Sequence, residues 1–451
     1  MSVLNTTVPF NTLDTIFKKS SRIFFIGIGG ASMASLAKYC LGEGKMVFGC
    51  DSRRTAVCQA LEKSCYIKYY SSTDSVYGMD LVIYTTAIDE SNFEYKRAKE
   101  LNIPLISRAN FLGYIISGYK NRIGICGMHG KSTVTSMLAH IFTCAKKEPC
   151  VFCGAEMGNY NSFEILTKGD SVIFEACEYL NAFHCLPATE CAITNIDFDH
   201  PDFFSSTDEI IKSFQEFANM AQRVYLNADN IYSLSIKHEN IITYGFENNS
   251  IYKGTFTHSP EDNSFRVYKN GEFIGECPLK LKGKHFAYDA LLAYAVAYEN
   301  GISSSAIGSA FEGFRGAKRR LEFIKKTSTG ASIFEDYAHH PTEIKATLNA
   351  LRDMGYKKIL CIFQAHTYSR TYMLYEQFKS AFIDTDTLII TPIYSAREKN
   401  TFGFTDEEFA LDCGGKYMDD FRKIAHHVSM LPVDAIVIMG AGDIGAIKGY
   451  F

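Results

Sequence analysis

One short segment of the chain, RIGICGMHGKSTVTSMLAHIF at residues 122–142, constrains the fold more than any other. An apolar strand pattern runs into Gly127 and Gly130, and a helical apolar pattern follows Ser132. Glycines let a backbone wrap closely around an anion, and the helix that follows presents the positive end of its dipole. The segment therefore predicts a phosphate-binding loop between a strand and a helix.

The spacing within this loop is shorter than that of the common P-loop. Only Gly127-x-x-Gly130-Lys131-Ser132 is present, because Ile125 stands where the first glycine of the longer form would be. In such a loop the Lys131 ammonium reaches terminal phosphate oxygens, and the Ser132 hydroxyl ligates Mg²⁺. The simpler alternative is a glycine-rich turn that carries a surface lysine.

A second glycine motif competes for a nucleotide. The segment GIGGAS at residues 27–32 follows a strand pattern, and Asp51 ends the next one. This is a partial dinucleotide fingerprint, because Ser32 stands at the third glycine position. We expect a phosphate-bearing ligand here, with Asp51 near a sugar hydroxyl. A nicotinamide-dependent dehydrogenase is an alternative from another class, but it leaves the loop at Lys131 unexplained.

Composition excludes several classes of protein. The chain has 451 residues and a net charge of −4, with 47% hydrophobic and 21% charged residues. It shows no dense basic block, no apolar run of membrane-spanning length and no signal-peptide pattern. Its 14 cysteines are scattered, which favours free thiols over a disulfide framework. We expect a cytoplasmic protein, monomeric or homodimeric, that binds neither nucleic acid nor membrane.

The order of strand and helix patterns predicts an α/β fold of three domains. Alternating strands and helices predict a Rossmann-like domain over residues 1–119. The phosphate loop, followed later by antiparallel strands with an Asn270-Gly271 hairpin turn, predicts a P-loop ATPase-like domain over residues 120–321. This central domain carries an added small antiparallel sheet. A third alternating series predicts a Rossmann-like domain over residues 322–451.

Acidic side chains follow two strand patterns of the second series. Glu175 and Glu178 come where one buried strand meets a loop, and TNIDFDH at residues 194–200 follows the next strand. Ligands of open α/β sheets bind at the carboxyl ends of the strands. We therefore expect the phosphate loop, Glu175 and His200 to converge at one edge of the sheet.

The third series adds histidines and an arginine. His339 and His340 follow one strand pattern, and His366 and Arg370 follow another. The adjacent histidines point apart on a strand end and lack a marked third ligand, which disfavours a zinc site. Arginine suits a carboxylate, because its paired N–H groups match the two oxygens.

Nine motifs occur in one order over nearly the whole chain: FIGIGGASM, GMHGKST, EACEY, TNIDFDH, GKHFAYD, FRGAKRR, DYAHHPTE, FQAHTYSRT and GAGDIG. Together they resemble the Mur ligases of peptidoglycan synthesis. The resemblance implies that the three domains hold a UDP-sugar, ATP and an incoming amino acid. It also implies a reaction through an acyl phosphate.

The DYAHHPTE segment and the opening glycine loop favour the branch of this family that joins L-alanine to UDP-N-acetylmuramate. Glycine or serine remains an alternative amino acid. Two further alternatives are a recycling ligase that attaches a preformed tripeptide to the same sugar, and a non-catalytic homologue that binds the UDP-sugar.

The resemblance implies three sets of contacts. The UDP-sugar contacts are Gly27, Ile28, Gly29, Gly30, Ala31, Ser32, Met33, Asp51, Thr85, Thr86, Ala87, Arg108 and Asn195. The ATP contacts are Gly127, Met128, His129, Gly130, Lys131, Ser132, Thr133, His285, Arg320 and Asp336. The amino-acid contacts are His339, His366 and Arg370.

The same resemblance implies how the reaction is catalysed. Two anions must approach each other, so cations have to neutralise them, and positioning supplies most of the rate enhancement. The catalytic residues that it implies are Lys131, Glu175, His200, His339 and Arg370. It implies two Mg²⁺ ions, held by Ser132, Glu175 and His200.

Four positions depart from the family pattern. Met128 stands where threonine is common, and Thr367 stands where a basic residue often follows the histidine. Phe286 and Asp289 replace an expected pair of asparagines. The last two changes put the adenine contacts in question and motivate the non-catalytic alternative.

Overall fold

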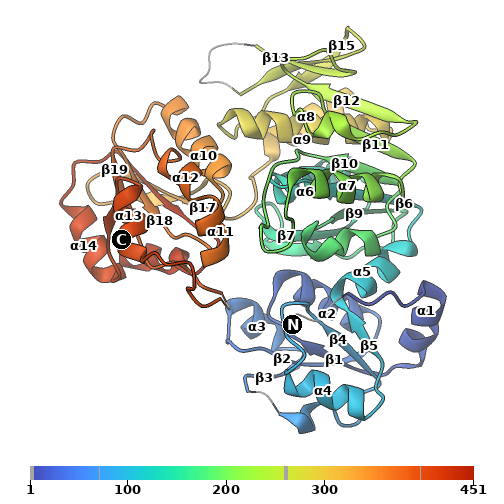
Figure 1. The fold of residues 1–451 in the computed structure, drawn as a ribbon. Helices are drawn as coiled ribbons and strands as arrows, with labels where there is room; N and C mark the ends of the chain where they lie inside the picture. Colours follow the sequence, from blue (N-terminus) through green and yellow to red (C-terminus); the bar gives the residue numbers. More distant parts are fainter. Residues whose placement is uncertain (1–4, 71, 258–262, 397) are drawn as a thin grey trace.

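The computed structural model describes residues 5–70, 72–257, 263–396 and 398–451. Within these residues the strands form three separate sheets in successive parts of the chain. The first two domains are stacked, and the third lies beside them (Figure 1). The predicted three-domain α/β fold is confirmed. Residues 1–4, part of the segment in which no signal peptide is expected, lie outside the described residues.

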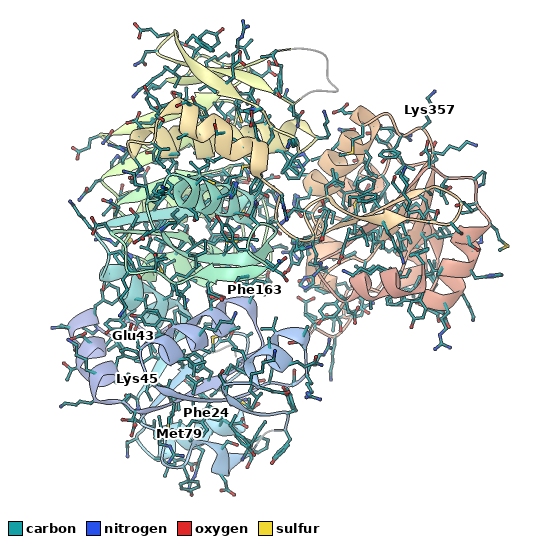
Figure 2. The ribbon with its side chains drawn as sticks, turned by 180° about the vertical axis from the view of Figure 1, so that it is seen from behind. Phe24, Glu43, Lys45, Met79, Phe163 and Lys357 are labelled. Atoms are coloured by element: carbon teal, nitrogen blue, oxygen red, sulfur yellow. The ribbon has the colours of Figure 1, made fainter. Side chains whose placement is uncertain are left out.

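The first domain has a parallel sheet with strand order β3-β2-β1-β4-β5. Its strands are β1 (Arg22–Ile26), β2 (Met46–Cys50), β3 (Tyr66–Lys68), β4 (Leu81–Tyr84) and β5 (Leu105–Ser107). Its helices are α1 (Phe10–Lys19), α2 (Ala31–Gly42), α3 (Ala56–Leu61), η1 (Thr73–Val76), α4 (Phe93–Glu100) and α5 (Arg108–Ser117). Apolar side chains cover both faces of the sheet; Phe24 and Met79 belong to the core on one face (Figure 2).

The central domain is built on the sheet β15-β14-β13-β12-β11-β10-β6-β9-β7-β8. Its strands are β6 (Asn121–Cys126), β7 (Cys150–Met157), β8 (Ser162–Ile165), β9 (Ser171–Glu175), β10 (Glu190–Ile193), β11 (Arg223–Asn227), β12 (Ile241–Gly245), β13 (Tyr252–Phe256), β14 (Phe265–Lys269) and β15 (Glu272–Cys277). Its helices are α6 (Lys131–Cys144), η2 (Tyr179–Cys185), α7 (Thr207–Ala218), η3 (Ser233–Ser235), α8 (Lys284–Glu299) and α9 (Ser304–Gly313).

The antiparallel strands of this domain are not a detached sheet. Tyr244 of β12 pairs with Tyr252 of β13 in parallel, so β13, β14 and β15 extend the central sheet at one end (Figure 1). The predicted hairpin turn joins β14 to β15, with Asn270 and Gly271 at φ 52° and 84°. Both angles are positive, as a type I′ turn requires.

The third domain has a mixed sheet with strand order β16-β17-β21-β18-β19-β20. Its strands are β16 (Glu322–Lys326), β17 (Ser332–Asp336), β18 (Ile359–Phe363), β19 (Thr387–Ile390), β20 (Lys416–Tyr417) and β21 (Ala435–Met439). Its helices are α10 (Pro341–Asp353), α11 (Tyr368–Met373), α12 (Tyr375–Lys379), α13 (Asp406–Asp412), α14 (Phe421–Ser429) and η4 (Ile444–Tyr450). β16 is antiparallel and the other strands pair in parallel. The predicted domain boundaries near residues 119 and 321 fall between the sheets and stay predictions.

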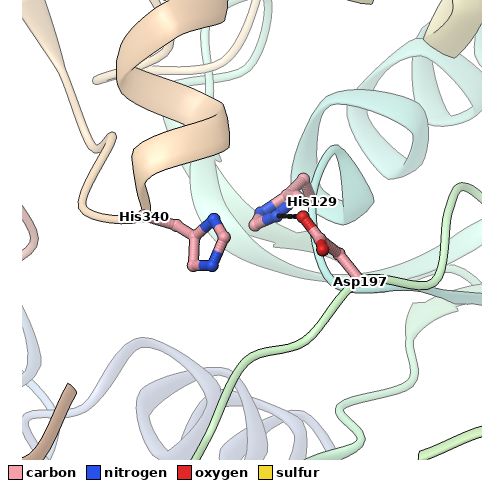
Figure 3. Close-up of side chains that lie close together, drawn as sticks. All are labelled: His129, Asp197 and His340. Atoms are coloured by element: carbon pink, nitrogen blue, oxygen red, sulfur yellow. Dashed lines mark ion pairs between the residues drawn. The ribbon is translucent and has the colours of Figure 1, made fainter. Parts of the chain in front are cut away.

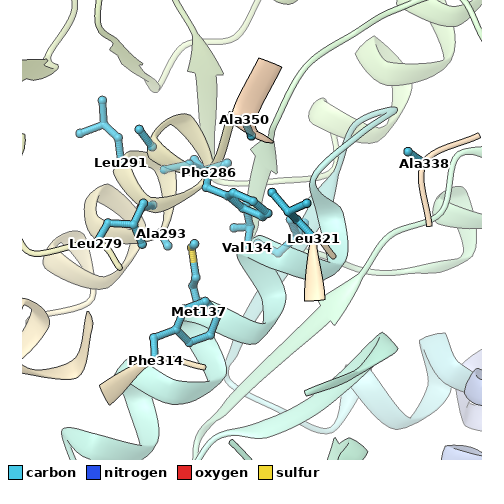
Figure 4. Packing of buried hydrophobic residues seen from close by; sticks show 14 of the residues in the cluster. Val134, Met137, Leu279, Phe286, Leu291, Ala293, Phe314, Leu321, Ala338 and Ala350 are labelled. Carbon is cyan, nitrogen blue, oxygen red and sulfur yellow. The ribbon is translucent and has the colours of Figure 1, made fainter. Parts of the chain in front are cut away.

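One hydrophobic core spans the central and third domains. Val134 of α6 and Phe286 of α8 belong to it, together with Leu321, Ala338 and Ala350 from the linker and the third domain (Figure 4). Phe286 is only 3% exposed, so its ring replaces a polar side chain at a position that is mostly core. This packing fixes α6 and α8 relative to each other and to the start of the third domain.

Two features of the described residues bear on the expectations from composition. Among these residues no helix combines the length and the apolar character needed to cross a membrane. All 14 cysteines are free, and even the buried neighbours Cys126 and Cys191 keep their Sγ atoms 3.6 Å apart. The cysteines therefore contribute as small packing groups rather than as cross-links.

Candidate active site

The phosphate loop lies where β6 meets α6. Gly127 and Gly130 have φ angles of 131° and 85°, which disfavour other residues. A Cβ atom on Gly127 would lie 2.0 Å from the Thr194 hydroxyl, and one on Gly130 would lie 2.4 Å from Asp289 Oδ1. Both glycines are therefore required by backbone angle and by space. The loop opens onto the N-terminus of a 14-residue helix, the arrangement that binds phosphate.

Lys131 is held in place at the start of that helix. Its Nζ atom donates to the carbonyls of Gly127 (2.5 Å) and Met128 (3.2 Å) and lies 3.0 Å from Glu178 Oε2. Glu178 is 1% exposed, and its Oε1 atom lies 3.2 Å from His200 Nε2. Burial alone would lower the pKa of Lys131, but Glu178 outweighs it and raises that pKa, so the ammonium stays charged.

Glu178 is a candidate functional residue to which the sequence pattern assigns no role. Glu175 was assigned instead, but its Oε1 atom accepts hydrogen bonds from the Gly154 N–H (2.5 Å) and the Cys153 thiol (3.3 Å). That thiol also lies 3.6 Å from the Ser132 carbonyl. Glu175 therefore lies on the Ser132 side of the loop, whereas Glu178 links Lys131 to His200. The available signal was that both acids follow the same strand.

The side chains around the loop fit Mg²⁺. Hydroxyl and carboxylate oxygens are the ligands that this ion prefers, and Ser132, Glu175 and Glu178 supply them. Glu178 Oε2 is buried, and the Lys131 ammonium lies 3.0 Å from it. The ion and the number of ions stay predictions.

A separate cluster of possible metal ligands joins the central and third domains. Ligand atoms of His129, Asp197 and His340 lie within 4.8 Å of one another (Figure 3). Nδ1 of His340 accepts a backbone N–H at the start of α10, and its Nε2 lies 3.1 Å from the Phe198 carbonyl. Both nitrogens of His340 are thus engaged, which leaves no lone pair for a metal ion.

This cluster instead works as a set of ion pairs. His340 and Glu343 form a capping box at the start of α10, with Pro341 in the first turn, and this fixes the Glu343 carboxylate. His129 places Nδ1 3.1 Å from Glu343 and Nε2 3.5 Å from Asp197. Burial would lower the pKa of His129, but these two carboxylates outweigh it and raise the pKa to about 10.

We expect the contact between the central and third domains to weaken in alkaline solution. His129 has a pKa of about 10 in the folded protein against an ordinary value of 6.5. The stabilisation that charged His129 gives to the folded protein is therefore complete below about pH 6.5 and is lost as pH rises through about 10. Hydrogen exchange in α10 between pH 7 and 10 measures this loss, and His129→Gln should show a smaller increase. An equal increase in both proteins contradicts the assignment.

The third domain contributes a buried cluster opposite His200. Arg370 Nε lies 2.8 Å from Asp199 Oδ1, and the two side chains are 7% and 5% exposed. Arg370 Nη1 lies 3.3 Å from His366 Nδ1, and the rings of His366 and His339 are 5.9 Å apart. The structure thus brings the three predicted amino-acid residues together. It also occupies Arg370 with Asp199, a carboxylate to which no role was assigned from sequence.

The two histidines of this cluster are neutral. Burial lowers the pKa of His339 to about 3 and that of His366 to about 4, and the Arg370 charge acts in the same direction. A neutral imidazole can accept a proton or a hydrogen bond. Because such low pKa values make both rings weak bases, they suit hydrogen bonding to an amine rather than keeping its proton.

A cavity of about 510 Å³ lies beside the phosphate loop. The predicted ATP residues that line it are His129, Gly130, Thr133, His285, Arg320 and Asp336. The other predicted ATP residues, Gly127, Met128, Lys131 and Ser132, belong to the adjoining loop. Burial lowers the pKa of His285 to about 4 and raises that of Asp336 to about 6. The size of the cavity is typical of a small-molecule site.

A larger cavity of about 1210 Å³ lies at the glycine loop of the first domain. The predicted UDP-sugar residues that line it are Gly27, Gly29, Gly30, Ala31, Ser32, Met33, Asp51, Thr85, Ala87 and Arg108. Ile28 is instead fully buried, and Thr86 is absent from the lining. Asn195 lies in the central cavity, where its side-chain amide bonds to both backbone groups of His129.

Polar contacts shape this first cavity. Asp51 Oδ2 accepts the Gly29 N–H at 2.9 Å, and Arg108 donates to the Ser32 hydroxyl at 3.1 Å. Sequence reasoning missed Arg53, which also lines the cavity and lies 3.4 Å from the Tyr394 hydroxyl. Tyr394 comes from the third domain, so two domains form the wall.

These features define a class of protein: three α/β domains with one cavity beside the loop at the start of α6 and a second cavity at the glycine loop of the first domain. Family models match all three domains: the Mur ligase family, catalytic domain (residues 22–120), the Mur ligase middle domain (125–297) and the Mur ligase glutamate ligase domain (319–442). The chain belongs to the Mur ligase family, and it is a ligase of a kind that uses ATP.

Full-length relatives support this placement. The UDP-N-acetylmuramate–L-alanine ligase of Caldanaerobacter subterraneus subsp. tengcongensis is 37% identical, over 95% of this chain and 96% of its own length. The ligase of the same name from Clostridium tetani is 36% identical, over 95% and 97%. The crystal structure of the UDP-N-acetylmuramate-alanine ligase of Thermotoga maritima matches with a TM-score of 0.83 at 25% identity, over 95% and 98%.

Proposed function

We propose that the protein joins L-alanine to the carboxylate of UDP-N-acetylmuramate at the expense of ATP, in the synthesis of peptidoglycan precursors. The observation that carries the proposal is the position of Lys131, charged and held by Glu178, on a phosphate loop beside the central cavity. Curated relatives with this name extend over nearly the full length of the chain. Since its substrates include ATP and a nucleotide sugar, we also propose a cytoplasmic location.

The three ligands are assigned to the three sites described above. The first cavity holds the UDP-sugar, near Asp51 and Arg108, and the central cavity holds ATP, near His285 and Arg320. The cluster around His366 holds the amino acid. Asn195 is assigned to the nucleotide rather than to the sugar because of its position in the central cavity.

The chemistry proceeds in two displacements. A carboxylate oxygen of the sugar attacks the γ-phosphorus of ATP, and ADP leaves as the P–O bond breaks. The amine of alanine then attacks the acyl carbon, phosphate leaves and the amine loses a proton. Lys131 neutralises the phosphate charge in the first step. In the second step the neutral rings of His339 and His366 accept hydrogen bonds from the attacking amine, and the departing phosphate takes the proton that the amine loses.

Magnesium belongs to this proposal, with Ser132, Glu175 and Glu178 as the residues that would hold it and His200 near a second ion. When bound, the ion supplies positive charge to the phosphate oxygens. Glu178 then has two tasks, since it also fixes Lys131.

The alternatives are less well supported. A recycling ligase that takes a tripeptide has solved counterparts, such as the murein peptide ligase of Psychrobacter arcticus, but at 21% identity this likeness shows the fold alone. The relatives that are 34–37% identical carry the alanine-ligase name. Glycine and serine remain candidate amino acids beside alanine.

The test is phosphate release in the presence of ATP, Mg²⁺ and UDP-N-acetylmuramate. We expect release to depend on L-alanine and to be weaker with glycine, serine or the tripeptide. Omission of the sugar is the matched control, since it removes the attacking carboxylate. Release that no amino acid stimulates contradicts the proposal, and preference for the tripeptide replaces it with the recycling activity.

A further inference from the structure

Tyr394 connects two of the sites described above. It follows β19, and its backbone pairs with the segment that carries His366. The Tyr394 N–H donates to the Ala365 carbonyl, and its carbonyl accepts the Thr367 N–H, both at 2.9 Å. Its ring stacks on that of His366, with the centroids 5.5 Å apart and the planes at 17°. Its hydroxyl lies 3.4 Å from Arg53 Nη1 in the wall of the first cavity. One side chain therefore contacts both the cluster around His366 and the first cavity.

The turn after β21 makes room for this ring. It contains the GAGDIG motif at residues 440–445, none of which lines either cavity. A Cβ atom on Gly442 would lie 2.6 Å from Cγ of Tyr394. The turn is itself held, because the Gln364 side chain accepts the Ile444 N–H at 3.1 Å. The glycine at this position therefore lets the tyrosine ring keep its stacked place.

The backbone next to His366 is strained. Thr367 has a φ angle of 68°, which a β-branched residue rarely adopts. Its hydroxyl accepts the Arg370 N–H at the start of α11, and the Tyr394 carbonyl accepts its own N–H. Strain of this kind persists only where the surrounding contacts enforce it. The pairing with Tyr394 therefore helps to hold the backbone from which both His366 and Arg370 project.

The contact with the first domain is weak by itself. At 3.4 Å the hydrogen bond between Arg53 and the Tyr394 hydroxyl is long, and Arg53 is exposed. A guanidinium group has paired N–H groups that match the oxygens of a phosphate. A phosphate-bearing ligand in the first cavity therefore suits Arg53, and the Tyr394 hydroxyl in the same wall offers that ligand a second hydrogen bond.

We propose that Tyr394 is a positioning residue that makes the affinity for the amino acid depend on the ligand in the first cavity. The ligand fixes the Tyr394 hydroxyl, and the stacked ring then fixes His366 where the amine binds. The inference rests on the proposed function, in which the first cavity holds the UDP-sugar and His366 contacts the amino acid. A general closure of the domains differs from it, because such closure does not depend on one hydroxyl group.

The test measures the affinity for L-alanine at equilibrium. ADP and Mg²⁺ replace ATP, so that no ligation occurs, and saturation-transfer NMR of the alanine methyl group reports binding with and without saturating UDP-N-acetylmuramate. The sugar should tighten alanine binding to wild type by about fivefold or more, the lower end of typical coupling between sites. Calorimetric titration of each protein with the sugar separates lost coupling from lost sugar binding.

Two variants divide the role of the side chain. Tyr394→Phe keeps the stacked ring, so it should bind alanine like wild type without the sugar, and the sugar should tighten binding by less than about twofold. Tyr394→Leu loses the ring as well and should bind alanine about twofold to tenfold more weakly without the sugar, the size of one aromatic contact. Tyr372→Leu is the matched control, since Tyr372 also stacks in the third domain, 5.0 Å from the Phe402 ring, and this variant should titrate like wild type. Thermal melts check the folding of each variant.

The outcomes separate the inference from the proposed function. The inference is overturned if the sugar does not tighten alanine binding in wild type, or if it acts as strongly in Tyr394→Phe. A folded Tyr394→Leu protein with the alanine affinity of wild type also overturns it. These results leave the proposed function standing, because wild type still releases phosphate in response to alanine. Wild type that neither binds alanine nor releases phosphate in its presence overturns both.

Discussion

Replacing Lys131 with methionine lowers turnover by about a thousandfold or more, the largest effect we expect from a single change. The ammonium is the cation that the loop directs at the phosphates, and preorganised charge of this kind supplies much of the rate enhancement. Affinity for the UDP-sugar should stay near that of wild type, because its cavity belongs to another domain. Phosphate release and calorimetric titration with the sugar measure the two effects.

The same change destabilises the protein for a separate reason. It leaves Glu178, which is 1% exposed, without its main counter-charge, and breaking a buried pair in this way costs about 3–5 kcal/mol. The double variant Lys131→Met/Glu178→Gln removes the stranded charge, so it should recover stability without recovering turnover. Loss of sugar binding in this folded double variant contradicts the assignment of the ligands to separate domains.

Asp199→Asn should release the third domain from the central one. Burial would raise the pKa of Asp199, but Arg370 outweighs it and holds the pKa well below its ordinary value, so the pair is charged at all ordinary pH values. Removing one partner leaves the guanidinium buried and uncompensated, a cost of about 3–5 kcal/mol. Turnover should fall about a hundredfold or more, and small-angle scattering should show a larger radius of gyration.

The surface pair Arg352–Asp386 supplies the control. Its side chains are 29% and 45% exposed, and both belong to the third domain. Asp386→Asn should lower the free energy of unfolding by less than about 1 kcal/mol and leave the radius of gyration unchanged. An Asp199→Asn protein with the radius and turnover of wild type refutes the role given to this ion pair.

The fold was predictable where local patterns determine it. Gly127 and Gly130 make their loop predictable from sequence, because only glycine meets both the backbone angles and the spatial limits found there. Asn270 and Gly271 make their hairpin predictable as well, because its turn requires two positive φ angles. What the pattern could not give is that β13 joins β12 in parallel, since that pairing depends on contacts distant from either strand.

The site was predictable in part. Spacing along the chain placed Glu175 and Glu178 at one strand end, but it could not decide which of them reaches Lys131. That choice is made by the turn after β9, where Leu180 and Asn181 have positive φ angles. The pairing of Arg370 with Asp199 joins residues 171 positions apart, and no local signal specifies such a contact.

The contact between Arg53 and Tyr394 joins residues 341 positions apart and ties the first cavity to the far end of the chain. A molecule that binds this cavity more tightly when Tyr394 forms part of its wall favours the domain arrangement in which Tyr394 lies there. Thermodynamic reciprocity then requires that a ligand which holds the third domain in this position raises the affinity for that molecule by the same factor. Binding that fixes the third domain therefore raises the affinity of the first cavity for its ligand.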